Sequence, residues 1–359
     1  MKKVMQPFHL IAFSLILLGC GGASSIASTN ASAPASTSTG SVVPAAGGFA
    51  KGADVSWVTE MEAAGIKFYN KAGIQKDLLE VLKEQGMDSI RLRVWVNPVD
   101  GKYNNMTDVI AKAKRVQAAG MRLMIDFHYS DTWADPDKQI KPAQWKDYSV
   151  DQLVAALADH TRSSLMLLRD AGITPEWVQV GNETDNGMLW EEGRATTNMK
   201  NYARLVGAGY AAVKEVFPQT LVIVHVSNCF DNVLFQWNIG GIKSNGGKFD
   251  VIGASAYPFY DKKNANWQAS NDQCLANLND MVTRFNVPVM IVETGTTLGS
   301  ADAKAILSDL IRKVRSVKEK KGLGILYWEP QAYGNWKGYT LGAFDQAGKP
   351  TSAMDAFLE

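Results

Sequence analysis

A short apolar run that ends abruptly in an amide and a carboxylate is the feature that most constrains this chain. Residues 177–180 contain a tryptophan and two valines, and Gly181, Asn182 and Glu183 follow directly. A helical stretch that stops near Gly172 precedes the run, so the pattern predicts a buried parallel strand with polar groups at its carboxyl end. That end of the strands is where α/β barrels carry their chemistry.

A second run of the same form occupies residues 288–293 and ends in Glu293. Two buried strands that each deliver one carboxylate to the same rim are what a glycosidase requires, because cleavage of a glycosidic bond uses two carboxyl groups that flank the bond. The two runs therefore predict a sugar-cleaving site at the mouth of a closed sheet.

Strand-like and helix-like segments alternate from residue 50 to the C-terminus. Strands are predicted at residues 52–57, 89–95, 122–128, 177–183, 221–225, 249–254, 288–293 and 323–329. Helices are predicted at residues 74–85, 108–119, 150–170, 202–217, 271–285, 301–317 and 352–358. This order predicts an α/β fold, a (β/α)8 TIM barrel that forms a single catalytic domain over residues 49–359. The alternative, an open doubly wound sheet, would need a glycine-rich phosphate turn, and the sequence contains none.

The N-terminus has the pattern of an export signal. Lys2 and Lys3 precede an apolar stretch that is too short to span a bilayer, which predicts a signal peptide over residues 1–19. Small residues just before Cys20 resemble a bacterial lipobox and predict a lipidated Cys20, followed by a flexible Ala/Ser/Thr/Gly tether over residues 20–48. We therefore expect an exported lipoprotein at the outer membrane or cell surface; the alternative is an ordinary cleaved signal and a secreted protein.

The net charge of the chain limits the class of molecule that it is expected to bind. The 37 basic and 36 acidic residues nearly cancel, which argues against nucleic acid and fits a neutral substrate. Contact with a membrane is expected through the Cys20 anchor only, and we expect a monomer.

Cys229 and Cys274 could form a disulfide in an exported protein, but the sequence leaves a disulfide and free buried thiols equally open.

The two glutamates need opposite protonation states. We assign Glu183 as the acid/base, which must keep its proton, and Glu293 as the nucleophile, which must stay ionised. The strand at residues 89–95 alternates polar and apolar side chains, and its Arg91 or Arg93 could supply the cation beside the nucleophile. Asn182 could donate a hydrogen bond to the sugar 2-hydroxyl.

Further side chains are candidates for binding the sugar. His128 is expected to form hydrogen bonds in the cleft, Trp95 to line the cleft, and Trp133, in a long polar loop at residues 129–145, to stack on a sugar. His225 and Glu329 are interpreted as structural. Because the histidines lack further ligands at fixed spacing, we predict no metal site and no cofactor.

Several motifs together resemble glycoside hydrolase family 53, the endo-β-1,4-galactanases. The resemblance runs from about residue 52 to the C-terminus and is carried by residues 91–98, 126–136, 177–190, 255–260 and 327–330. It implies a clan A barrel that acts with retention of configuration, with Glu183 as acid/base and Glu293 as nucleophile. It also implies that Arg91 and Tyr257 hold the nucleophile, that Asn182 binds the sugar, and that Trp328 forms a platform beneath it.

The resemblance implies a substrate as well as a fold. The expected activity is cleavage of the β-1,4-galactan side chains of pectin by double displacement. Two alternatives remain: another clan A endo-β-glycanase that acts on mannan, xylan or glucan, and a non-catalytic glycan-binding lipoprotein. The chain departs from the family after Glu293, where the predicted helix resumes almost at once. The long seventh loop that holds calcium in some bacterial members is therefore absent from the sequence.

Overall fold

The computed structural model describes residues 47–359. The predicted signal peptide, Cys20 and almost all of the predicted tether lie outside the described residues. Within residues 47–359, no helix combines the length and the apolar character that crossing a membrane requires.

Eight parallel strands close into a barrel in the described part of the chain, in the order in which they occur in the sequence. They are β1 (Ala50–Asp54), β2 (Ser89–Val94), β3 (Arg122–Phe127), β4 (Trp177–Val180), β5 (Leu221–Val226), β6 (Val251–Ala256), β7 (Val289–Thr294) and β8 (Gly322–Trp328). The predicted (β/α)8 barrel is therefore confirmed, and β1 ends earlier than predicted because Val58 already begins a helix.

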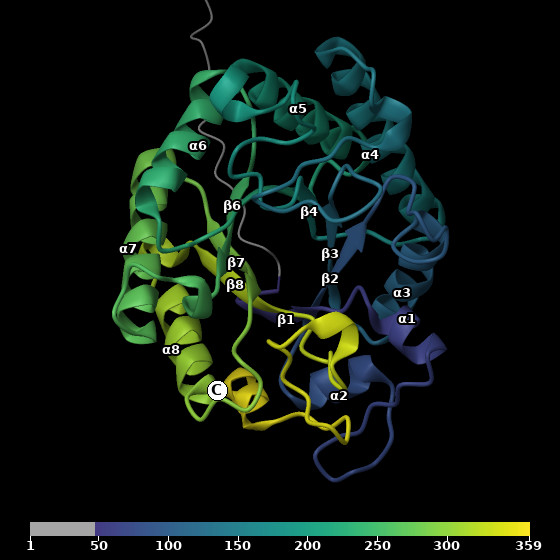
Figure 1. Ribbon diagram of the computed structural model, residues 1–359, viewed down its shortest axis with the longest axis vertical. Coiled ribbons are helices and arrows are strands. Elements are labelled where there is room, and N and C mark those ends of the chain that lie inside the picture. Colours follow the sequence, from purple (N-terminus) through teal and green to yellow (C-terminus); the bar gives the residue numbers. More distant parts are fainter. Residues whose placement is uncertain (1–46) are drawn as a thin grey trace, which may run out of the picture. The chain divides into compact units, whose positions relative to one another are not determined.

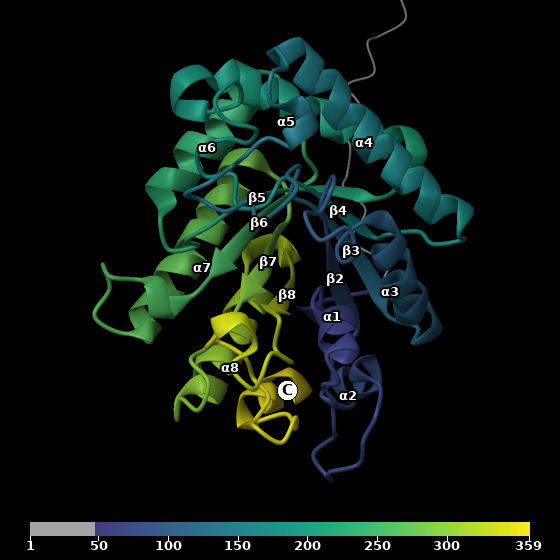
Figure 2. The ribbon, with the colours of Figure 1, turned by 45° about the vertical axis from the view of Figure 1, so that its right-hand side comes forward.

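Helices surround the barrel (Figure 1), and α4 and α5 lie side by side (Figure 2). They are α1 (Val58–Ala63), α2 (Leu78–Glu84), α3 (Met106–Ala118), α4 (Val150–Asp170), α5 (Ala195–Val216), α6 (Asn232–Ser244), α7 (Trp267–Phe285) and α8 (Ala303–Arg315). The predicted helix at residues 74–85 begins only at Leu78, since the Asp77 carboxylate caps it by accepting a hydrogen bond from the Leu79 amide at 2.8 Å. The last predicted helix is instead a 3₁₀ helix, η5 (Ser352–Leu358).

The barrel interior changes from apolar to polar along the strands. An apolar cluster that is separate from the main core fills the lower interior, and it includes Met124, Trp177 and Ile223. Because side chains alternate along a strand, the next inward positions on the same three strands are Asp126, Gln179 and His225, all fully buried. The apolar layer thus forms the floor on which the polar groups of the upper rim rest.

A disulfide joins Cys229, in the loop after β5, to Cys274 on α7, which settles the alternative that the sequence leaves open. Asn277 of α7 also donates a hydrogen bond to the Cys229 carbonyl at 2.8 Å. The loop after β5 is therefore fixed to the outer helices at two neighbouring points.

Replacing both cysteines by serine is expected to lower the free energy of unfolding by about 4 kcal/mol, because the bond closes a loop between residues 45 positions apart and so restricts the unfolded chain. Urea unfolding of the double variant beside the oxidised protein measures this change. A difference below about 1 kcal/mol would contradict the expectation, and the oxidised protein treated with reductant serves as the control.

Candidate active site

A cleft of about 760 Å³ opens at the carboxyl ends of the strands. Both predicted catalytic glutamates, Glu183 and Glu293, line it. Of the other predicted site residues, those in its wall are His128, Trp133, Asn182, Tyr257 and Trp328. The structure thus brings the ends of β3, β4, β6, β7 and β8 together around one cavity, as barrel topology requires.

Glu293 lies near the end of β7 and contacts a cation. Arg91 Nη1 is 3.0 Å from Glu293 Oε1, and the Tyr257 hydroxyl donates to Glu293 Oε2 at 3.2 Å. These contacts fix both oxygens of the carboxyl group. Burial raises the pKa of Glu293 to about 7, against the opposing effect of the Arg91 charge.

Glu183 follows β4 in a left-handed backbone conformation, with φ of 43°. Its amide donates to His225 Nδ1 at 3.2 Å, so the proton of the neutral imidazole is on Nε2. His225 Nε2 then donates to Ser255 Oγ at 2.8 Å, and Ser255 Oγ donates to Glu183 Oε1 at 2.6 Å. His225, interpreted from the sequence as structural, thus orients the Glu183 carboxyl group through one hydroxyl.

The surroundings of Glu183 favour its protonated form. Burial is the largest influence, and the charges of Glu293 and Asp185 add to it, so the pKa of Glu183 is raised well above its usual range. No cation in the described residues forms an ion pair with Glu183, whereas Arg91 pairs with Glu293. Burial raises the pKa of both carboxyl groups, but only Glu293 has a cation beside it.

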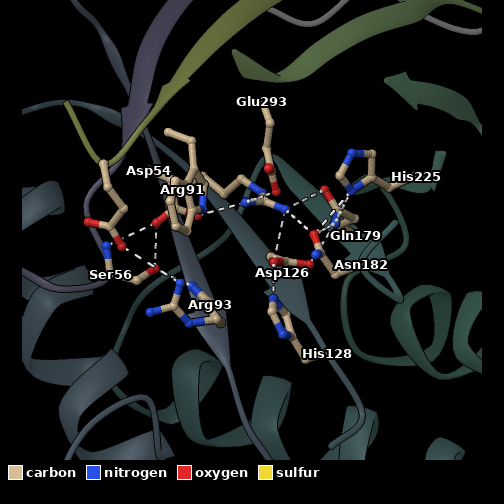
Figure 3. A network of polar contacts seen from close by, with 12 residues as sticks. Asp54, Ser56, Arg91, Arg93, Asp126, His128, Gln179, Asn182, His225 and Glu293 are labelled. Atoms are coloured by element: carbon tan, nitrogen blue, oxygen red, sulfur yellow. Dashed lines mark hydrogen bonds and ion pairs between the residues drawn. The ribbon is translucent and has the colours of Figure 1, made fainter. Parts of the chain in front are cut away.

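Arg91 is the centre of a buried polar network, and Figure 3 shows it reaching between three carboxylates. Its guanidinium lies 2.7 Å from Asp54, 2.9 Å from Asp126 and 3.0 Å from Glu293. Burial alone would lower the pKa of Arg91, but the carboxylates outweigh it and raise that pKa. Arg91 therefore remains a cation, although it does not itself line the cleft.

Asn182 and His128 are held by the same network. Asn182 Oδ1 accepts from Arg91 Nη2 at 2.8 Å, and its Nδ2 donates to the Ala134 carbonyl at 2.9 Å, which leaves a second Nδ2 hydrogen for a ligand. His128 Nδ1 accepts from the Ala134 amide, so its Nε2 carries the proton that faces Asp126 at 3.1 Å. Both side chains reach the cleft with fixed orientations.

Aromatic rings form one wall of the cleft. Trp328 and Trp133 lie 5.9 Å apart between ring centroids, and Trp57 packs edge-on against both. Trp95, predicted to line the cleft, is not among the residues that line it; its ring packs edge-on against Trp133 at 5.4 Å, and its Nε1 donates to His128. Trp95 therefore supports the wall without lining it.

Arg93 and Glu329 lie behind this wall rather than in the cleft. Arg93 is 3.7 Å from Glu329 and 4.1 Å from the Trp133 ring, so of the two candidate arginines only Arg91 contacts Glu293. Glu329 is fully buried and accepts hydrogen bonds from the Trp57 amide and Gln331. These contacts agree with the interpretation of Glu329 as structural.

The sequence places Asp54 either in the cleft or in the barrel interior, and the structure buries it against Arg91. Sequence reasoning missed other polar residues around the two glutamates: Asp126, Gln179, Asp185, Ser227 and Ser255. Asp126 and Ser255 occupy inward positions in the upper half of their strands, and this alternation was the signal that could have found them. Within residues 47–359, no group of three or more His, Cys, Asp or Glu side chains is arranged to hold a metal ion.

Comparison with known proteins agrees with this geometry. Residues 50–357 match the model of glycosyl hydrolase family 53. An arabinogalactan endo-beta-1,4-galactanase of Humicola insolens is 36% identical, with 78% of this chain and 89% of that protein covered.

Solved structures with a similar fold also come from this family of glycosyl hydrolases. A fungal beta-1,4-galactanase superposes with a TM-score of 0.79 at 34% identity, over 86% of this chain and 98% of that one. The GH53 catalytic domain of Ignisphaera aggregans has a TM-score of 0.78 at 28% identity, over 88% and 98%. The resemblance found in the sequence motifs is confirmed, and the chain belongs to glycosyl hydrolase family 53.

Proposed function

We propose that this protein is a retaining endo-β-1,4-galactanase that cleaves the β-1,4-galactan side chains of pectin. The observation that carries the proposal is the contrast between the two carboxyl groups of the cleft. Glu293 contacts the Arg91 cation, whereas Glu183 accepts a hydrogen bond from the Ser255 hydroxyl and pairs with no cation in the described residues. Environments that separate two carboxyl groups in this way assign the nucleophile and the acid.

In the first step, an oxygen of Glu293 attacks the anomeric carbon of the bound sugar. Glu183 gives its proton to the glycosidic oxygen, the bond from the anomeric carbon to that oxygen breaks, and the shortened chain leaves as an alcohol. Arg91 and Tyr257 hold Glu293 in position for the attack. Asn182 donates its remaining Nδ2 hydrogen to the 2-hydroxyl of the same sugar.

In the second step, the ionised Glu183 takes a proton from water. The water oxygen attacks the anomeric carbon, and the bond to Glu293 breaks, which restores both carboxyl groups to their starting states. Two displacements at one carbon leave its configuration unchanged. Trp328 and Trp133 supply flat apolar faces against which the sugar rings pack.

The substrate proposal is supported by the relatives, which are named arabinogalactan endo-beta-1,4-galactanases. A reducing-sugar assay on purified β-1,4-galactan beside mannan, xylan and glucan tests it. Hydrolysis of galactan is the expected result, and hydrolysis of mannan alone would overturn the galactanase proposal. Binding of galactan without hydrolysis would favour a glycan-binding protein instead.

The pH dependence of kcat/KM is expected to be bell-shaped. Below the pKa of Glu293, about 7, kcat/KM should rise about tenfold per pH unit, because the nucleophile must lose its proton. At higher pH it should fall as Glu183, whose pKa burial raises well above its usual range, loses the proton it must donate. A pH profile of kcat/KM on β-1,4-galactan, whose leaving sugar needs the proton from Glu183, checks this. The high-pH limb should disappear in Glu183→Gln, and its persistence there would contradict the assignment.

We also propose that the protein acts as a monomer anchored through a lipid on Cys20 and is exported to the outer membrane or cell surface. The support is the sequence of residues 1–48, which has the order of a lipoprotein signal followed by a tether. Fractionation of producing cells into membrane and soluble parts tests the anchor. Recovery of the protein in the soluble fraction alone would favour the secreted alternative.

A further inference from the structure

The loop between β5 and α6 brings two polar residues, Ser227 and Asn228, into the wall of the cleft. Asn228 Nδ2 donates to Ser227 Oγ at 2.7 Å, and Ser227 Oγ donates to Asp185 Oδ2 at 2.5 Å. The Ser227 amide donates to the other oxygen, Asp185 Oδ1, at 2.7 Å. Because an ionised carboxylate only accepts, this relay has one direction, from Asn228 through Ser227 to Asp185.

The relay fixes the orientation of the Asn228 amide group. One of the two Nδ2 hydrogens is committed to Ser227, which fixes the amide plane so that its oxygen, Oδ1, points elsewhere. In the part of the chain that the structure describes, this Oδ1 accepts no hydrogen bond, and the half-buried side chain lies in the cleft wall. Asn228 therefore presents one oriented acceptor to whatever occupies this part of the cleft.

The surrounding loops are built to hold this position. Asn238 of α6 donates to the carbonyls of Thr184 and Asp185, at 2.7 and 3.0 Å. The amide of Cys229, the residue after Asn228, donates to the Ser255 carbonyl at 2.8 Å, and the disulfide holds Cys229 from the other side. A polar group held this firmly loses little conformational entropy when a ligand binds.

The position of Asn228 indicates which part of a substrate it would meet. Asn228 follows β5, between β4, which is followed by the proposed acid Glu183, and β6, which carries Ser255. The proposed nucleophile and Trp328 come from β7 and β8. Because the acid must face the glycosidic oxygen that leaves, the sugar attached to that oxygen lies on the Asn228 side.

We propose that Asn228 binds the sugar on the leaving-group side of the cleft, with Oδ1 accepting a hydrogen bond from one of its hydroxyl groups, and that Ser227 and Asp185 are positioning residues for Asn228. The ligand is thus a leaving group that carries hydroxyls, such as the galactose units released from a galactan chain. This inference rests on the galactanase activity proposed above and adds a contact that the reaction chemistry alone does not require.

The test compares two substrates in the same preparation of Asn228→Ala. One is β-1,4-galactan, whose leaving group is a sugar, and the other is an aryl β-1,4-galactobioside, whose leaving group has no sugar hydroxyl. The ratio of kcat/KM for galactan to kcat/KM for the aryl substrate should fall about tenfold, as expected for loss of one hydrogen bond. The ratio does not depend on how much of the preparation is folded. An unchanged ratio would overturn the proposal.

Asn245→Ala is the matched control, because Asn245 lies at the far end of α6 and its side chain donates to the Gly241 carbonyl. Its ratio should equal that of the unaltered protein. The unaltered protein is measured first. If it cleaves another polysaccharide and not galactan, the galactanase proposal fails, and the ratio is then measured with that polysaccharide and its aryl disaccharide.

The variant Asp185→Asn tests whether Asp185 acts by positioning Asn228 or by binding the sugar itself. The new amide can donate to Ser227, which releases the serine hydroxyl to donate to Asn228 and allows the Asn228 amide to turn over. The substrate ratio should fall by about threefold to tenfold, and the double variant with Asn228→Ala should fall no further than Asn228→Ala alone. If the fall in the substrate ratio of the double variant equals the product of the falls in the two single variants, Asp185 does not act through Asn228.

Discussion

Glu293→Gln is expected to lower kcat on β-1,4-galactan by on the order of 10⁴-fold or more, the loss seen when a covalent nucleophile is removed. Glutamine matches glutamate in shape and can still accept the hydrogen bond from Tyr257, but its amide oxygen cannot form the ester with the anomeric carbon. Initial rates of reducing-sugar release measure the loss, and Glu319→Gln, which alters an exposed carboxylate on a surface turn, is the control.

The binding of galactan separates this result from unfolding. Because Glu293→Gln leaves the aromatic wall and Asn182 in place, the variant should still bind galacto-oligosaccharides with an affinity close to that of the unaltered protein. Isothermal titration calorimetry on the inactive variant measures this affinity. Loss of binding together with activity would show that the substitution damages the cleft, and activity above about one per cent would exclude Glu293 as the nucleophile.

Glu183→Ala is expected to lower kcat on galactan by about 10³-fold, because the leaving sugar then departs without a proton. On an aryl β-1,4-galactobioside with a good leaving group, kcat/KM should change far less, since its first step needs little acid assistance. The second step then lacks a base, and added azide should restore the rate by attacking the intermediate. The expected product is the β-glycosyl azide, whose configuration matches that of the substrate.

The configuration of the azide product tests the assignment of the two acids. If Glu293→Ala is restored by azide to give the β-product, the two roles are reversed. An α-product from Glu293→Ala fits the present assignment, because azide then replaces the missing nucleophile and inverts the anomeric carbon once. Identification of the anomer by proton NMR gives the answer for both variants.

Strands β2, β3, β5, β7 and β8 agree with the predicted ranges to within one residue at each end, because strands buried on both faces leave short apolar runs. Helix α6 was not predicted, and its composition gives the reason: Gly240 and Gly241 lie in its interior, where glycine weakens a helix. Tertiary contacts override that weakness, since Phe235 and Ile239 of α6 are fully buried in the core.

The site was harder to predict than the barrel, because the residue that an inward side chain contacts depends on how far along its strand, toward the carboxyl end, that side chain lies. Arg91 and Arg93 both point inward from β2, and alternation cannot distinguish them. In the folded barrel Arg91 is paired in register with Asp54 of β1, and this depth places its guanidinium against Glu293. Arg93, two residues further up, meets Glu329 and the aromatic wall instead.

Trp95 shows a related limit. Its position after β2 predicted a place in the cleft, but Trp133 of the loop at residues 129–145 lines the cleft, and Trp95 packs edge-on against it. The course of a long loop depends on contacts distant in sequence, such as the hydrogen bonds from the Asn97 and Ala143 amides to Asp131 at 2.9 and 2.8 Å. Local pattern contains no information about such contacts.

The left-handed backbone of Glu183 has a consequence for engineering. A non-glycine residue at φ of 43° costs on the order of 1 kcal/mol or more, so the native fold is less stable than it would be with glycine at this position. Thermostabilising selection that ignores activity should therefore favour replacement of the proposed acid itself. Directed evolution of this protein toward heat resistance must screen for turnover at every round, since a substitution that relieves the strained backbone at Glu183 also removes the proposed acid.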